Sequence, residues 1–167
     1  AAKSDVDAFL EAATSEIDGV INSTKQSLAQ ALFQDGSGVK GIAAAGTTTT
    51  SIVLADVNTV VNFEVNMTLA TASTALGAVD AGVGVITDID RDNGVITISP
   101  AIPALASGRF IFQDGDASNG SGVLRKVVGL AGWVPATTPT ATPFFGVIRT
   151  VDTLRLGGVR YDASLET

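Results

Sequence analysis

The fold is decided by residues 4–39, SDVDAFLEAATSEIDGVINSTKQSLAQALFQDGSGV. As far as Phe33, the apolar residues recur three or four positions apart, which is the spacing of one face of an α-helix. These residues are Val6, Leu10, Ala13, Ile17, Val20, Ile21, Leu28, Ala31 and Leu32. Ser4 is placed to cap the N-terminus, and Asp35-Gly36 is a typical stop signal. We therefore predict a helix over residues 4–33, about 45 Å long.

A helix of this length with a narrow apolar stripe is expected to lie across a partner layer. The partner is either a sheet of its own domain or a neighbouring subunit. The alternative is an ordinary amphipathic core helix with a break at Gly19, since glycine is a poor helix former. The sequence does not decide between them.

Residues 47–115 carry a β pattern of short runs rich in Val, Ile and Thr. Strands are predicted at residues 51–55, 67–72, 82–89, 95–99 and 109–113. Asn93-Gly94 joins two of these strands and is a strong hairpin signal. Residues 41–50, rich in Ala, Gly and Thr, are predicted to be a linker. Five strands over this length fit a small β-barrel or sandwich.

Composition excludes several chemistries. The 167-residue chain has neither cysteine nor histidine, so disulfides, thiolate metal sites and a Ser-His-Asp triad are impossible. The net charge of −7 argues against a general nucleic-acid binder. The charge is uneven, at −3 for residues 1–45, −5 for residues 46–115 and +1 for residues 116–167.

Residues 36–41, GSGVKG, match two known sequence motifs that overlap. The spacing fits the dinucleotide pattern G-x-G-x-x-G, but that pattern belongs between a strand and the N-terminus of a helix, and here it follows a helix. Ser37 and Lys40 also match Ser-x-x-Lys, whose serine should open a helix. We interpret the segment as a helix C-cap and turn.

The remaining motifs have similarly simple interpretations. Residues 88–94, DIDRDNG, resemble the start of a calcium loop, but the glycine is one position late and Ser99 stands where Glu is needed. A solvated acidic hairpin tip is the better interpretation. Asn22, Asn66 and Asn119 begin glycosylation sequons that carry little weight here. We nominate no catalytic, cofactor-binding or metal-ligating residue, and we predict that the chain is not an enzyme.

Residues 116–167 show little periodicity. The uncharged stretch 127–148 holds three prolines and is predicted to be extended rather than a membrane helix. Trp133 and the pair Phe144-Phe145 are predicted to anchor this segment on the helix or the sheet. A further helix is expected to begin near Ser164, which leads us to expect that more protein follows.

Five further segments are informative when they are taken together: SEIDG (15–19), FQDGSG (33–38), GLAGWVP (129–135), FFGVIRTVD (144–152) and LGGVRYD (156–162). In this order they resemble the tailed-phage major capsid proteins of the Hong Kong 97 type. Each segment alone is weak evidence, but their order is fairly specific, and together they span most of the chain.

The resemblance implies an α+β fold in which a long spine helix packs on a β-sheet and a small β-barrel or sandwich domain is inserted. Residues 1–46 would hold the spine helix and turn of a peripheral domain, residues 47–115 the β insertion, and residues 116–167 the return to the peripheral domain. The family's N-terminal arm and axial domain are missing, so the chain would be a central fragment.

The function implied is that of a capsid subunit that self-assembles into an icosahedral shell around DNA. Its partners would be further copies in hexamers and pentamers, with packaged DNA on the inner face near Arg125, Lys126, Arg149 and Arg155. No cofactor, membrane or small-molecule substrate is expected. The protein would occur in the virion, and in the host cytoplasm during assembly.

Two alternatives belong to other classes. A carbohydrate- or surface-binding β module of a phage tail or adhesin fits the Thr-rich strands, but not the long helix. A small enzyme that uses only carboxylates is possible in principle, yet no pair of acids is singled out.

Overall fold

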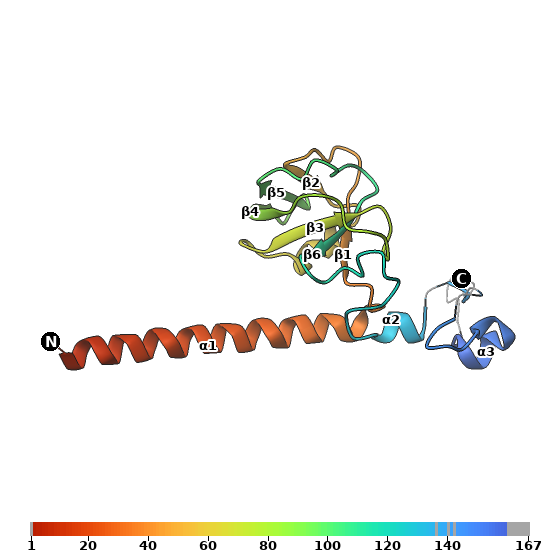
Figure 1. Ribbon diagram of the computed structural model, residues 1–167, viewed down its shortest axis with the longest axis horizontal. Coiled ribbons are helices and arrows are strands. Elements are labelled where there is room, and N and C mark those ends of the chain that lie inside the picture. The colour runs from red at the N-terminus through yellow and green to blue at the C-terminus, as the bar shows by residue number, and fades with distance from the viewer. Residues whose placement is uncertain (1, 136, 140, 142, 160–167) are drawn as a thin grey trace, which may run out of the picture.

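A computed structural model describes residues 2–135, 137–139, 141 and 143–159. Helix α1 (Ala2–Phe33) spans 32 residues without interruption, and the C-terminal segment lies beyond its C-terminal end (Figure 1). The predicted helix and its end at Phe33 are confirmed. The predicted alternative of a break at Gly19 is wrong, because that residue lies inside the continuous helix.

A six-stranded antiparallel sheet forms the second part of this α+β fold. Its spatial order is β1-β6-β3-β4-β5-β2. The strands are β1 (Val39–Ile42), β2 (Ser51–Val53), β3 (Thr68–Ala72), β4 (Gly84–Asp90), β5 (Val95–Ser99) and β6 (Phe110–Gln113). All five predicted strands are present. The Asn93-Gly94 hairpin is confirmed, since β4 pairs with β5 up to Asp90 and Val95.

The two outer strands of the sheet, β1 and β2, meet each other just beyond their ends. Ala43 and Leu54 form an antiparallel bridge. The amide of Ala44 donates to the carbonyl of Val53 at 2.7 Å, and that of Ala55 donates to the carbonyl of Ile42 at 2.8 Å. The sheet therefore curls until its first and last strands share hydrogen bonds.

Side chains from all parts of this curled sheet meet in one hydrophobic core. Its members are strand residues facing inward at alternate positions, together with loop residues that close the ends. The fully buried ones include Ile52, Phe63, Leu69, Ile86, Ile96, Ile98, Ile102 and Ile111. Phe63 follows the 3₁₀ helix η1 (Val57–Asn62), which covers the side of β1. The sheet is thus stabilised by its own core, to which none of the described side chains of α1 contributes.

Strand β1 was not predicted, because residues 41–50 read as linker. It is a strand because Gly41 allows other residues to pack closely on it. A Cβ at Gly41 would lie 3.1 Å from Leu54 and 3.2 Å from Phe63. Glycine weakens a strand signal but often marks such an approach. The pairing of β1 with β6 joins residues 39–42 to the β-rich segment.

The described part of the C-terminal segment contains three single-turn helices, α2 (Leu130–Trp133), η2 (Arg149–Val151) and α3 (Thr153–Leu156). They follow α1 at its C-terminal end (Figure 1). Gly129 abuts the carbonyl oxygens of Ala31 and Leu32, and its amide donates to the carbonyl of Gln34 at 2.9 Å. This contact fixes α2 to the end of α1. The helix expected near Ser164 lies outside the described residues.

Candidate interaction surfaces

The glycine-rich segment is the connection from α1 to β1. Gly36 and Gly38 have φ angles of 85° and 81°, a left-handed conformation that glycine adopts freely. The Asp35 carboxylate accepts hydrogen bonds from the amide of Ser37 at 2.9 Å and its hydroxyl at 2.6 Å. The interpretation as a turn after the helix is confirmed. Because the segment follows the C-terminus of α1, the helix dipole there does not favour a phosphate.

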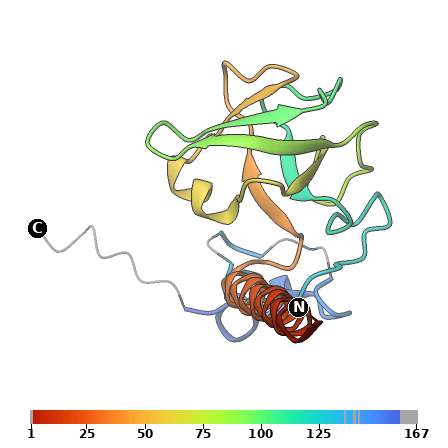
Figure 2. The same ribbon diagram turned by 90° about the vertical axis from the view of Figure 1, so that its left-hand side faces the viewer.

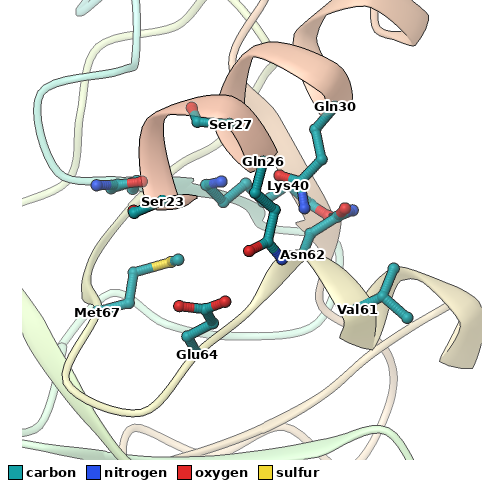
Figure 3. Close-up of a pocket in the computed structure, with 10 residues that line it drawn as sticks. Ser23, Gln26, Ser27, Gln30, Lys40, Val61, Asn62, Glu64 and Met67 are labelled. Carbon is teal, nitrogen blue, oxygen red and sulfur yellow. The ribbon is translucent and has the colours of Figure 1, made fainter. Parts of the chain in front are cut away.

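Lys40 lies buried where this turn enters the sheet, facing α1 (Figure 3). Burial lowers the pKa of its ammonium below the usual value of 10.5, and nearby Lys126 lowers it further. The carboxylates of Asp116 and Glu64 act in the opposite direction. Asp116 is also paired with Lys126, with Nζ 2.9 Å from Oδ2. Lys40 is therefore the buried member of a charged group at the joint between helix and sheet, whose partners Asp116 and Lys126 are half-buried.

The cavity beside Lys40 is small. Its volume is about 40 Å³, and polar residues of α1 line one side of it: Ser23, Gln26, Ser27 and Gln30 (Figure 3). Pockets for small organic ligands usually measure at least about 300 Å³. The cavity suits water molecules between two polar surfaces rather than a substrate.

The hairpin tip at residues 88–94 is organised by its own side chains. Asp90 accepts hydrogen bonds from the amides of Asp92 and Asn93, and from Asn93 Nδ2 at 2.7 Å. The bonds from Asn93 lower the pKa of Asp90 below its usual 3.8. Within the described residues, no group of three or more acidic side chains is arranged to hold a metal ion. The carboxylate of Asp90, at the third position of the calcium-loop match, is therefore used in the turn.

The apolar face of α1 is open to solvent in the N-terminal two thirds of the helix. Its large residues are between 43% and 71% exposed. We call this surface the N-terminal stripe, and it comprises Val6, Phe9, Leu10, Ile17, Val20 and Ile21. The sheet lies to one side of the helix axis (Figure 2). The prediction that the apolar face of the helix packs on the sheet is wrong for this sheet, because the helix turns Ser23, Gln26 and Gln30 toward it.

Three aromatic side chains in the C-terminal segment pack on one another. The ring of Trp133 lies 5.1 Å from Phe144 and 5.8 Å from Phe145, and the two Phe rings are 4.8 Å apart. Arg149 stacks on Phe144 at 4.1 Å and donates to the carbonyls of Gly132 and Trp133. We call these four residues the aromatic cluster. The predicted anchoring on the helix or the sheet is wrong, since Trp133 and Phe145 stay 57% and 69% exposed.

The four basic residues expected near DNA have different surroundings. Lys126 is paired with Asp116, and Arg149 belongs to the aromatic cluster. Arg155 is almost fully exposed, 3.7 Å from Asp152, and Arg125 is exposed beside the C-terminal third of α1. Arg125 and Arg155 are therefore the two of these four cations that are exposed to an outside partner, and Arg155 is also paired with Asp152.

No protein-family model, curated protein or solved structure matches this chain. Among the described residues, none of the helices is both long enough and apolar enough to cross a membrane.

Proposed function

We propose that this chain is part of the subunit of a phage or prophage capsid and that copies of it assemble into a closed icosahedral shell. The observation that carries the proposal is the N-terminal stripe. Six large apolar side chains stay exposed on one straight helix, and a surface of this kind marks an interaction site. The five sequence segments that resemble Hong Kong 97-type capsid proteins support the same function.

In this proposal the curled sheet is a small β-barrel inserted between the spine helix and the C-terminal segment. Its core is closed by its own residues, and its outer strands share the Ala43–Leu54 bridge. A module that is stable by itself can be inserted into a subunit without disturbing the contacts of the helix. Its acidic residues would face outward, away from DNA.

The partners proposed are further copies of the chain in hexamers and pentamers, with DNA on the inner face. The exposed Arg125 and Arg155 are the described cations best placed to contact phosphate. The role is structural rather than enzymatic, in the virion and, during assembly, in the host cytoplasm.

Negative-stain electron microscopy of the gene product that carries this chain, after size-exclusion chromatography, tests the proposal. Closed shells, or rings of five and six subunits, are the expected result. A monodisperse small species that stays unassembled would overturn it. A glycan array would then test binding by the β module, which is the function proposed by the alternative.

A further inference from the structure

A polar groove lies between the C-terminal third of α1 and the β module, next to the small cavity at Lys40. The volume of the groove is about 420 Å³, which is in the range of sites for small ligands. The groove and the cavity share Ser23, Ser27 and Gln113 as lining residues. The cavity alone has room only for water, but together with the groove it forms one larger site between helix and sheet.

Lys40 is the buried residue of this site. It is only 8% exposed, and within the described part of the chain its ammonium makes no hydrogen bond and no ion pair. It lies between Ser23 and Ser27 of α1 on one side and Glu64 on the other (Figure 3). An ammonium carries three N–H donors, and burying them without acceptors costs free energy. Lys40 therefore favours a site for an anion.

The cations of the site outnumber its carboxylates. Lys40, Arg125 and Lys126 are the described cations that line the cavity or the groove. The carboxylates beside them are those of Asp116 and Glu64. Lys126 uses one of its three donors on Asp116, with Nζ 2.9 Å from Oδ2, and two donors remain. This local excess of positive charge is opposite to the net charge of −7 of the chain.

Uncharged donors face the same space from α1. Ser23 and Ser27 are four positions apart, so their side chains lie on one face of the helix. Neither hydroxyl makes a hydrogen bond within the described residues, whereas that of Thr24 donates to the carbonyl of Val20 at 2.8 Å. Hydroxyl and ammonium donors that converge on one space suit an oxyanion, because each forms a charge-assisted hydrogen bond to it.

Glu64 gives the site a preference among oxyanions. Its carboxylate points toward the cavity from the sheet side (Figure 3), and it makes no ion pair within the described residues. An ionised carboxylate can only accept hydrogen bonds, so it repels an anion that carries no proton. Phosphate keeps an O–H at neutral pH, whereas sulfate and the phosphodiesters of DNA have none. Phosphate can therefore donate to Glu64.

We propose that this groove binds a free phosphate ion, with Lys40, Lys126 and Ser27 donating to its oxygens and Glu64 accepting its proton. The ligands come from α1, from the β module and from the segment after it, so the bound ion joins the helix to the sheet. A free ion is favoured over nucleic acid because a phosphodiester has no proton for Glu64 and the acidic chain repels a polyanion. The site is independent of the proposed capsid function.

Isothermal titration calorimetry of the whole chain with inorganic phosphate tests the site. The titration is done at about pH 7 and at constant ionic strength, which keeps general screening unchanged. Lys40→Met is expected to fold, because it removes a buried charge, and to bind phosphate at least about tenfold more weakly. Lys25→Met removes a lysine of α1 that does not line the groove and should bind phosphate as the unmodified chain does.

Glu64→Gln tests the preference for phosphate. The unmodified chain is expected to bind phosphate at least about tenfold more tightly than sulfate. The variant should lose most of this preference, because an amide can also donate a hydrogen bond to sulfate. Amide chemical shifts followed by NMR should change at Ser23, Ser27 and Gln113 when phosphate is added, which locates the ion in the groove.

Three results would overturn the site. They are the absence of phosphate binding with a Kd below about 1 mM, equal binding by Lys40→Met and the unmodified chain, and equal affinity of the unmodified chain for phosphate and sulfate. A single-stranded oligonucleotide of about 12 nucleotides is the second probe. If it binds through Lys40 and phosphate does not, the groove is a nucleic-acid site and the proposal is wrong. Assembly is not measured in these titrations, so the capsid function stands or falls by microscopy.

Discussion

The guanidinium of Arg109 lies 3.1 Å from Oδ1 of Asp80, so the start of β6 is joined to the connection between β3 and β4. The other carboxylate oxygen of Asp80 accepts a hydrogen bond from the buried hydroxyl of Thr71 at 2.8 Å. The amide of Asp80 also donates to the carbonyl of Thr71 at 2.7 Å. One aspartate thus holds three parts of the β module together.

Replacing Asp80 by Ala is expected to lower the free energy of unfolding by about 2 kcal/mol, because a half-buried arginine and a buried hydroxyl lose their partner. Urea denaturation of both proteins measures the difference. Asp88→Ala, which removes an exposed carboxylate, is the control and should change stability by less than about 0.5 kcal/mol. Equal midpoints for the two variants would show that the ion pair contributes nothing.

Gly129→Ala is expected to loosen the joint between α1 and α2. The added Cβ would overlap the carbonyl oxygens of Ala31 and Leu32, and these backbone atoms cannot move without disturbing the end of the helix. A loss of about 2 kcal/mol is expected. Hydrogen exchange at the amide of residue 129, bonded to the carbonyl of Gln34, should become faster.

Gly19→Ala is the matched substitution, and it should change stability in the opposite direction. A Cβ at Gly19 meets nothing within 4 Å, and alanine is the better helix former by up to about 1 kcal/mol. The variant should therefore gain helical signal and thermal stability. If Gly19→Ala destabilises the chain as much as Gly129→Ala does, the steric explanation for Gly129 fails.

Lys40→Met is expected to stabilise the chain at neutral pH by about 1 kcal/mol or more, because it replaces a desolvated ammonium with an apolar side chain of similar length. The folded-state pKa of Lys40 is lowered, so the unfolded chain binds the proton more tightly. The stability of the unmodified chain should then rise with pH between the lowered pKa and the usual 10.5. The advantage of the variant should shrink over the same window.

Urea denaturation at about pH 7 and about pH 10 measures this change. Lys25→Met removes an exposed lysine of α1 and serves as the control, with no pH-dependent difference expected. An advantage of Lys40→Met that stays constant between the two pH values would contradict the assignment of a lowered pKa to Lys40.

Asn93→Ala is expected to raise the pKa of Asp90 toward its usual value of 3.8, since the bonds from Asn93 are the main cause of the lowered value. With a lowered folded-state pKa, the contribution of Asp90 to stability is present above the unfolded pKa and is lost as pH falls through the folded one. Carboxyl chemical shifts followed by NMR titration give the pKa in both proteins. Unchanged titration curves for Asp90 would show that Asn93 is not the cause of its lowered pKa.

Local patterns predicted most of the elements, because each was encoded in consecutive residues. The three-four spacing up to Leu32 required a helix, and Asn93-Gly94 required a hairpin. Strand β1 was not predicted because the segment Val39–Ile42 is short and contains Gly41. A glycine in this strand is favourable only because Leu54 and Phe63, which are distant in the sequence, pack closely against it.

The partners of the two exposed surfaces could not be predicted from such patterns. An apolar periodicity shows that one face of α1 is suited to burial, but it does not identify what would cover that face. The sequence indicated that Trp133 and Phe144-Phe145 are anchoring aromatic residues. Their contacts could not be predicted, because they join residues separated by a proline-rich segment. Those rings were expected on the helix or the sheet and instead pack on each other.

The hydrogen bonds that join β1 to β2 also determine how the molecule behaves when crowded. Exposed strand edges are templates for uncontrolled growth, in which one molecule extends the sheet of another. Here the outward carbonyl of Ile42 is bonded to Ala55, that of Lys40 to the side chain of Asn62, and that of Val53 to Ala44. Copies packed side by side at high local concentration would therefore resist pairing their strand edges into amyloid-like sheets. The β module could then be present at high density without aggregating.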